Sequence, residues 1–209
     1  MSDRMTCMPF SQILNWVFDE YRTKGTVFGV HRPYKANPDK AYELFGNKLE
    51  TPIGPAAGPG TQLSQNIIAS YFAGARFFEV KTVQILDGED LPVSKPCINA
   101  EDEGYNVEWS TELYVPDAMD EYINAWVMLH LMAKEMGLGA QDGFQFNMSV
   151  GYDLKGIQSE KINTFIDSLI EAKDTDAFKT AITVAKANLN KFQHVTEADI
   201  DAIPSQICY

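Results

Sequence analysis

The apolar residues of this chain recur alternately at helical and at strand spacing. Residues 9–22 carry apolar side chains at helical spacing, and Gly25 follows them. Such spacing gathers the apolar side chains into one stripe, so it predicts an amphipathic helix near the N-terminus. A polar, irregular stretch then leads to a first expected strand at about residues 49–57.

The alternation continues through the middle of the chain. The apolar residues at 67–72 predict a helix that ends at Gly74, and β-forming side chains fill residues 76–83. A long helix is expected next, with Asp117 as its N-cap and Gly137 after its end.

The clearest strand is residues 144–150, where apolar and polar side chains alternate strictly. Its polar face carries Gln145, Asn147 and Ser149. His130 lies on the preceding helix between core-facing and polar neighbours, so we expect it at the boundary of the core rather than in a metal site.

Two more amphipathic helices are expected, one with its apolar stripe at residues 162–170 and one from Thr175 to about Phe192. Thr196 and Asp199 predict a short final helical turn, and an extended segment begins at Ser205. Strands that alternate with helices imply a parallel sheet with crossover helices. The fold class is therefore α/β, either a (β/α)-barrel or an open doubly wound sheet.

Composition narrows the possible partners. The chain of 209 residues carries 29 acidic and 17 basic side chains, for a formal charge of −12. Such a surface repels phosphate backbones and anionic lipids, so we expect neither nucleic acid nor membrane as a partner. No stretch reaches the roughly 20 apolar residues that span a bilayer, and the first residues lack the apolar centre of a signal peptide.

The three cysteines, Cys7, Cys97 and Cys208, lie far apart in the chain. Their number and spacing argue against a disulfide framework and against a metal site, and fit a reducing cytoplasm. An iron–sulfur cluster with the usual four cysteine ligands cannot be built from this chain alone.

Two motifs point to chemistry. Residues 51–61 are rich in glycine, proline and alanine, and small side chains let a backbone approach a flat ring closely. A tight structural turn is the alternative interpretation. Lys81 stands near the end of the expected strand at 76–83, at the end of a barrel where active sites gather. A lysine that reaches the surface is the alternative there.

Together these motifs resemble a known family. Pro-Ile-Gly-Pro-Ala-Ala-Gly at 52–58, followed by Glu-Val-Lys-Thr at 79–82, resembles the first two strands of the dihydroorotate and dihydropyrimidine dehydrogenase flavoproteins. Tyr-Asn-Val-Glu at 105–108 is similar to their substrate-facing asparagine segment. Residues 88–103 and 147–154 are similar to the selenate reductase iron–sulfur subunits, in which an FMN barrel is joined to an FAD and nicotinamide module and to ferredoxin-like elements.

The resemblance implies a set of site residues. Those implied to contact FMN are Ala57, Gly58, Lys81 and Thr82, and Asn106 is implied to bind the substrate, a small heterocyclic molecule. Asn147 and Ser149 share the polar face of their strand and are also expected to face the substrate. FAD and iron–sulfur clusters would belong to other modules, which would be the redox partners of this barrel.

The resemblance also implies an incomplete (β/α)8 TIM barrel of the FMN-linked dehydrogenase type. Residues 1–44 would form an N-terminal helix and extension, and residues 45–209 the first half of the barrel. A complete barrel takes about 250 residues, so we expect a fragment that is inactive alone, from an FMN-dependent, multi-module oxidoreductase. A dehydrogenase of the dihydropyrimidine or dihydroorotate type and a non-catalytic assembly scaffold are the alternatives.

Overall fold

The computed structural model describes residues 6–37, 39–81, 113–149 and 154–208. The helices and strands follow the chain in the order α1 (Phe10–Lys24), β1 (Tyr42–Leu44), β2 (Asn47–Leu49), η1 (Pro59–Gln62), α2 (Ser64–Ala73), β3 (Phe77–Lys81), α3 (Val115–Met136), β4 (Gln145–Ser149), α4 (Leu154–Ile157), α5 (Glu160–Ile170), α6 (Asp176–Ala187), η2 (Leu189–Lys191) and α7 (Glu197–Asp201).

The expected parallel pairing is confirmed for the two central strands. β3 and β4 run parallel, with Phe77 opposite Gln145 and Lys81 opposite Ser149. Cys208 forms an isolated parallel bridge with Phe146, so the extended segment that begins near Ser205 enters on the free side of β4. The spatial order therefore follows the chain order, as it does in a barrel, but the described residues form an open α/β arrangement and no closed barrel.

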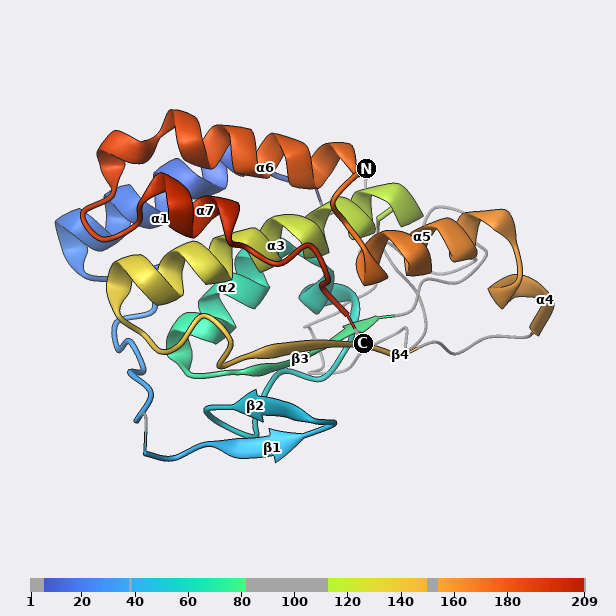
Figure 1. The fold of residues 1–209 in the computed structure, drawn as a ribbon, viewed down its shortest axis with the longest axis horizontal. Helices are drawn as coiled ribbons and strands as arrows, with labels where there is room; N and C mark the ends of the chain where they lie inside the picture. Colours follow the sequence, from blue (N-terminus) through green and yellow to red (C-terminus); the bar gives the residue numbers. More distant parts are fainter. Residues whose placement is uncertain (1–5, 38, 82–112, 150–153, 209) are drawn as a thin grey trace, which may run out of the picture.

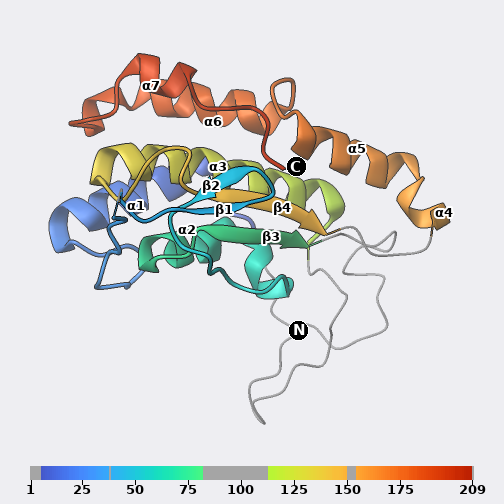
Figure 2. The same ribbon diagram turned by 60° about the horizontal axis from the view of Figure 1, so that its bottom comes forward.

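All the longer helices lie on one side of this sheet, and the hairpin of β1 and β2 lies on the other (Figure 1). The helices are stacked in two layers, with α6 and α7 outermost over α3 (Figure 2). The apolar face of the sheet packs against α3. On that face the rings of Phe78 and Phe146 are 5.2 Å apart, and the ring of Trp126, on α3, lies 5.3 Å from that of Phe146. None of the described helices is long and apolar enough to cross a bilayer.

The first expected strand is wrong. Within residues 49–57 only Leu49 belongs to a strand, and that strand pairs antiparallel with β1. The Ile53 carbonyl accepts hydrogen bonds from the backbone N–H groups of Arg76 and Phe77 at 3.0 and 3.2 Å, so the segment does lie beside β3. The ladder cannot continue because prolines at 52 and 55 lack the N–H that a strand donates. A Cβ on Gly54 would lie 1.5 Å from the Phe77 carbonyl oxygen, so this close approach requires glycine.

Two expectations for the long helix are also wrong. α3 begins at Val115 after Tyr114, so Asp117 lies in its first turn and is not the N-cap. His130 is in the core and not at its boundary, with 2% of its surface exposed. Its ring lies 4.6 Å from Trp126 and 4.9 Å from Phe144. Because β4 packs on one side of α3 and the outer helices on the other, the middle of the helix, where His130 lies, is kept from water.

The later helices lie close to where the sequence predicts them. Thr175 caps α6 by accepting a hydrogen bond from the Phe178 N–H, although the helix ends at Ala187 and η2 follows. Thr196 and Asp199 exchange hydrogen bonds at the start of α7, which confirms the short final helical turn that these two residues predicted.

A completely buried ion pair lies where β3 begins. Arg76 Nε donates to Glu50 Oε2 at 2.8 Å, and the other guanidinium nitrogens donate to the carbonyl oxygens of Tyr71, Ala75 and Leu138. Glu50 Oε1 accepts from the backbone N–H of residue 140 at 2.6 Å. A buried pair is tolerable only when its remaining hydrogen bonds are made, and here they are made to four residues, which lie at the end of α2 and in the loop after α3.

We predict that Glu50→Gln lowers the free energy of unfolding by about 3–5 kcal/mol, because it leaves the buried Arg76 charge without its counter-charge. Urea denaturation followed by circular dichroism measures this change. Asp174→Asn is the control, since it removes the partner of Lys179 from an exposed pair at 3.6 Å and is expected to cost less than about 1 kcal/mol. Equal losses for the two variants would contradict this account of the pair.

His130 gives a pH-dependent prediction. Burial lowers its pKa from 6.5 to about 3, so the folded protein resists a proton that the unfolded chain accepts. Stability from this group is therefore complete above pH 6.5 and falls as the pH drops from 6.5 toward 3, by about 2 kcal/mol at pH 5.

The measurement compares urea denaturation at pH 7.5 and pH 5 for the natural chain and for His130→Phe, which keeps an aromatic ring in place. The variant is expected to lose less stability between the two pH values. His194→Gln, at an exposed position, is expected to behave like the natural chain. An unchanged pH dependence in His130→Phe would show that His130 is not the responsible group.

Candidate functional site

The carboxyl ends of β3 and β4 bring together several of the residues that the sequence singled out. Register places Lys81 beside Ser149 and Glu79 beside Asn147. Register partners in a parallel pair present their side chains to the same face, and the opposite face holds Phe78 and Phe146 against α3. These four positions therefore share the face of the sheet that points away from the helices.

We call Gln145, Asn147 and Ser149 the polar row. Its residues become more exposed toward the carboxyl end of β4, from 1% exposure at Gln145 to a half-buried Asn147 and an exposed Ser149. Gln145 Nε2 donates to Asn147 Oδ1 at 2.5 Å. The strand alternation predicted this face correctly, although it gave no sign that two of its amides are bonded to each other.

The turn at Ala57 and Gly58 lies near the carboxyl end of β3, where η1 contacts the strand (Figure 2). The Gly58 N–H donates to Thr61 Oγ1 at 2.9 Å, and the Thr61 hydroxyl lies at the same distance from the Gly58 carbonyl oxygen. A Cβ on Gly58 would meet no atom of the described residues within 4 Å, and its φ of −169° is open to any residue. The described part of the fold therefore does not require glycine here, in contrast to Gly54.

The remaining expected residues cannot be placed in full. Thr82 and Asn106 lie outside the described residues, as do Val150 and Cys97. Lys81 is the last residue of β3, and only its backbone is described. The structure thus brings Lys81, Asn147 and Ser149 to one end of the sheet and places Ala57 and Gly58 near it.

A buried carboxylate binds the start of α2, the helix that follows the turn and η1, and the sequence gave no signal for it. Glu121 on α3 is 1% exposed and accepts hydrogen bonds from the backbone N–H and the hydroxyl of Ser64 at 2.6 and 2.7 Å. Ser64 is the first residue of α2, so the carboxylate satisfies the positive end of that helix. Burial raises the pKa of Glu121, and burial followed by Asp117 and Asp176 raises that of Asp120 to about 6.

Neither described cysteine is a nucleophile. Burial, followed by the charges of Glu121, Asp117 and Asp120, raises the pKa of the Cys7 thiol to about 12, and burial does the same for Cys208. Both therefore stay protonated at neutral pH, whereas nucleophilic attack needs the thiolate. Among the described residues, no group of three or more histidine, cysteine, aspartate or glutamate side chains could hold a metal ion.

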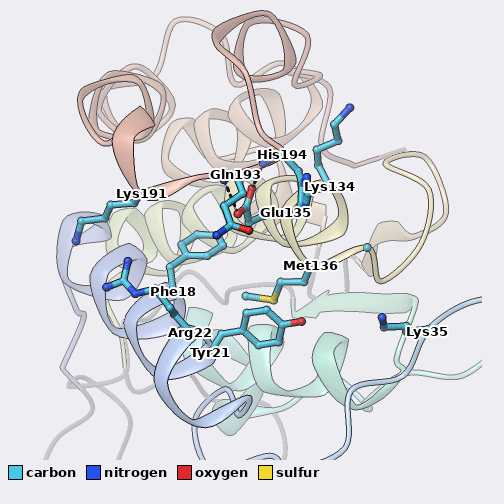
Figure 3. Close-up of a pocket in the computed structure, with 11 residues that line it drawn as sticks. Phe18, Tyr21, Arg22, Lys35, Lys134, Glu135, Met136, Lys191, Gln193 and His194 are labelled. Atoms are coloured by element: carbon cyan, nitrogen blue, oxygen red, sulfur yellow. Dashed lines mark hydrogen bonds between the residues drawn. The ribbon is translucent and has the colours of Figure 1, made fainter.

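A cavity with about 450 Å³ of space lies at the opposite end of the molecule (Figure 3). Phe18 and Met136 line it together with basic side chains from the last turns of α1 and α3. Glu135, in its wall, accepts backbone hydrogen bonds from residues 193, 194 and 195. Lys134 is paired with Asp199 at 3.2 Å. These contacts join α3 to α7 and to the loop before it, so we interpret them as structural.

Comparison with known proteins places the chain. The family model for the N-terminal TIM-barrel domain of the oxidoreductase YgfK matches residues 28–209. Proteins described as "Putative oxidoreductase YgfK" from Escherichia coli strains K12 and O157:H7 are each 46% identical over 181 residues, which is 85% of this chain. The chain spans 17% of the length of these curated relatives. No solved structure matches it. The chain therefore belongs to the family of YgfK oxidoreductase N-terminal TIM-barrel domains.

Proposed function

We propose that this chain is the N-terminal part of an FMN-binding barrel in a multi-module oxidoreductase, and that the flavin lies between the turn at Ala57 and Gly58 and the carboxyl ends of β3 and β4. Membership of an oxidoreductase TIM-barrel family supports the reaction class. The observation that carries the flavin proposal is that no described atom lies within 4 Å of a Cβ on Gly58, near the end of the sheet where Lys81, Asn147 and Ser149 come together.

The residues present fit a flat ring. Ala57 and Gly58 offer only small groups, and Thr61 braces the turn through its hydrogen bonds with Gly58, so the surface exists before any ligand binds. Because the Gly58 N–H is already used by Thr61, the ring is expected to lie against the face of the turn rather than to accept a hydrogen bond from this group.

FMN, when bound, accepts or donates a hydride, and the protein orients it and adjusts its potential. Lys81 at the end of β3 would place a positive charge near the ring, which favours the anionic reduced form. Thr82 would contact the ring, and Asn106, Asn147 and Ser149 would bind the substrate. These roles rest on the family resemblance and on the shared position of Lys81, Asn147 and Ser149.

The wider reaction follows from the same proposal. The substrate would be a small unsaturated or heterocyclic molecule, with a dihydropyrimidine or dihydroorotate as the alternative. FAD and iron–sulfur clusters in other modules would exchange electrons with the FMN, in the cytoplasm. The length of the curated relatives leaves ample chain for such modules.

We predict that Gly58→Ala weakens FMN binding about 10-fold or more, because the added methyl group would enter the space that the ring needs. Stability without flavin is expected to stay unchanged, since no atom of the part of the chain that the structure describes lies within 4 Å of that position. Flavin fluorescence quenching measures the affinity of the natural polypeptide that contains this chain, and thermal denaturation without flavin measures its stability.

Ala73→Ser is the matched control. It also adds one heavy atom, at an exposed position on α2, and is expected to leave FMN affinity unchanged. A natural polypeptide that binds no flavin would overturn the proposed function. Normal FMN affinity in Gly58→Ala would instead show that the flavin does not contact this turn.

A further inference from the structure

The cavity between the last turns of α1 and α3 has an apolar floor (Figure 3). Phe18 and Met136 line it and are each only 4% exposed. The ring of Phe18 packs against Phe192 at 5.0 Å, and Tyr21, which also lines the cavity, packs against Phe72 at 6.0 Å. Because these rings are held by residues outside the cavity, the floor keeps its shape without a ligand.

The rim of the same cavity is basic. Four basic side chains line it, one from each of four segments: Arg22 on α1, Lys35 before β1, Lys134 on α3 and Lys191 on η2. Among the described lining residues the acidic side chain is Glu135, whose oxygens accept the backbone N–H groups of residues 193–195. The whole chain has 29 acidic and 17 basic side chains, so the cavity has the opposite balance of charge.

Helix ends explain only part of this charge. Arg22 and Lys134 lie in the last turns of their helices, where the helix dipole favours a cation, and Lys134 also has an acidic partner on α7. Arg22 and Lys191 share one carboxylate, because Asp19 lies 2.8 Å from the first and 4.0 Å from the second. Among the described residues no carboxylate pairs with Lys35. Three cations thus have one counter-charge.

We propose that this cavity binds a small organic anion, whose carboxylate or phosphate group lies at Arg22 and Lys191 and whose flat apolar part covers Phe18 and Met136. A guanidinium group binds two oxygens of such an anion at once, and an ammonium group adds a point charge. The space of about 450 Å³ is within the usual range for small-molecule sites, which combine an apolar lining with a few polar groups.

This site is separate from the proposed flavin site, which is at the carboxyl ends of β3 and β4. The inference therefore goes beyond the proposed function and does not rest on it. Asp19 competes with the bound anion for the same two cations, so the site has a built-in competitor whose removal is expected to strengthen binding. A purely structural role for these basic side chains gives no such effect.

The first experiment titrates 1-naphthyl phosphate into the natural polypeptide that contains this chain, with saturating FMN, and measures the heat of binding. We expect a dissociation constant below about 1 mM. 1-Naphthoate distinguishes a carboxylate from a phosphate as the preferred anion. Uncharged 1-naphthol is expected to bind at least about 10-fold more weakly, because it lacks the charge. Equal affinity for 1-naphthol, or no binding of either anion, would overturn the proposal.

Substitutions then test the basic rim. Arg22→Gln and Lys191→Gln are each expected to weaken the binding of 1-naphthyl phosphate about 5-fold, and Asp19→Asn to strengthen it about 3-fold. Lys48→Gln, at an exposed position on β2, removes the same charge and is the control. If all four variants bind the probe equally, the probe binds elsewhere and the proposal fails.

A further pair of variants covers the case in which the loss of Lys191 disturbs the fold, since this residue is also bonded to Asn15. Gln193→Glu adds a negative charge at an exposed position in the cavity wall and is expected to weaken binding about 5-fold. Gln206→Glu adds the same charge at an exposed position outside this cavity and is expected to bind normally. Equal affinities in this pair would also contradict the proposal.

The last experiment locates the bound probe. Methionine methyl groups of the natural polypeptide are labelled with carbon-13, and the Met136 resonance is assigned by its loss in Met136→Leu. The naphthyl ring is expected to shift this resonance as 1-naphthyl phosphate is added, because ring and methyl group would be in contact. A Met136 resonance that stays in place while the probe binds would show that the cavity is not the site. If the polypeptide binds no flavin, both experiments are made without FMN and still decide this inference.

Discussion

The buried ion pair between Arg76 and Glu50 determines how the rest of the described structure is joined. One guanidinium group binds the carboxylate that follows the hairpin, the end of α2, and the loop after α3, while its own backbone begins β3. Cβ atoms on Gly139 and Gly143 would lie 2.1 and 2.4 Å from Glu50, so two glycines make room for this carboxylate. A charge in the interior is thus balanced by segments that are distant in the sequence.

The two ends of the sheet differ in what they hold. At the amino ends of the strands, the Arg76–Glu50 pair is buried. The nearby cavity is lined by Glu135 and Lys134, whose bonds connect structural elements. At the carboxyl ends, the side chains of the polar row become more exposed toward Ser149, and no described atom lies within 4 Å of a Cβ built on Gly58. In TIM barrels, stability is commonly concentrated at the first end and chemistry at the second. The described part of this chain follows the same division although it forms no closed barrel.

The sequence predicted those features that depend on local spacing. The polar face of β4, the caps at Thr175 and Thr196, and the parallel pairing all follow from periods of 2 and 3.6 residues. Features set by distant partners were missed. Prolines prevented a strand at 49–57 despite its apolar residues, and His130 was misplaced because the helices that cover α3 cannot be read from its own pattern. In the candidate site, the sequence predicted the strand face on which Asn147 lies but not its bond to Gln145.

The distances along the chain between the partners of the ion pair bear on the order of folding. Arg76 and Leu138 are 62 residues apart, and Glu50 and residue 140 are 90 apart. Closing loops of this length costs chain entropy before any contact compensates for it, whereas the helices are stabilised by near neighbours. We therefore expect the helices to form first and the parallel strands to join late. During synthesis, β3 therefore cannot form its parallel pairing until the ribosome has delivered β4.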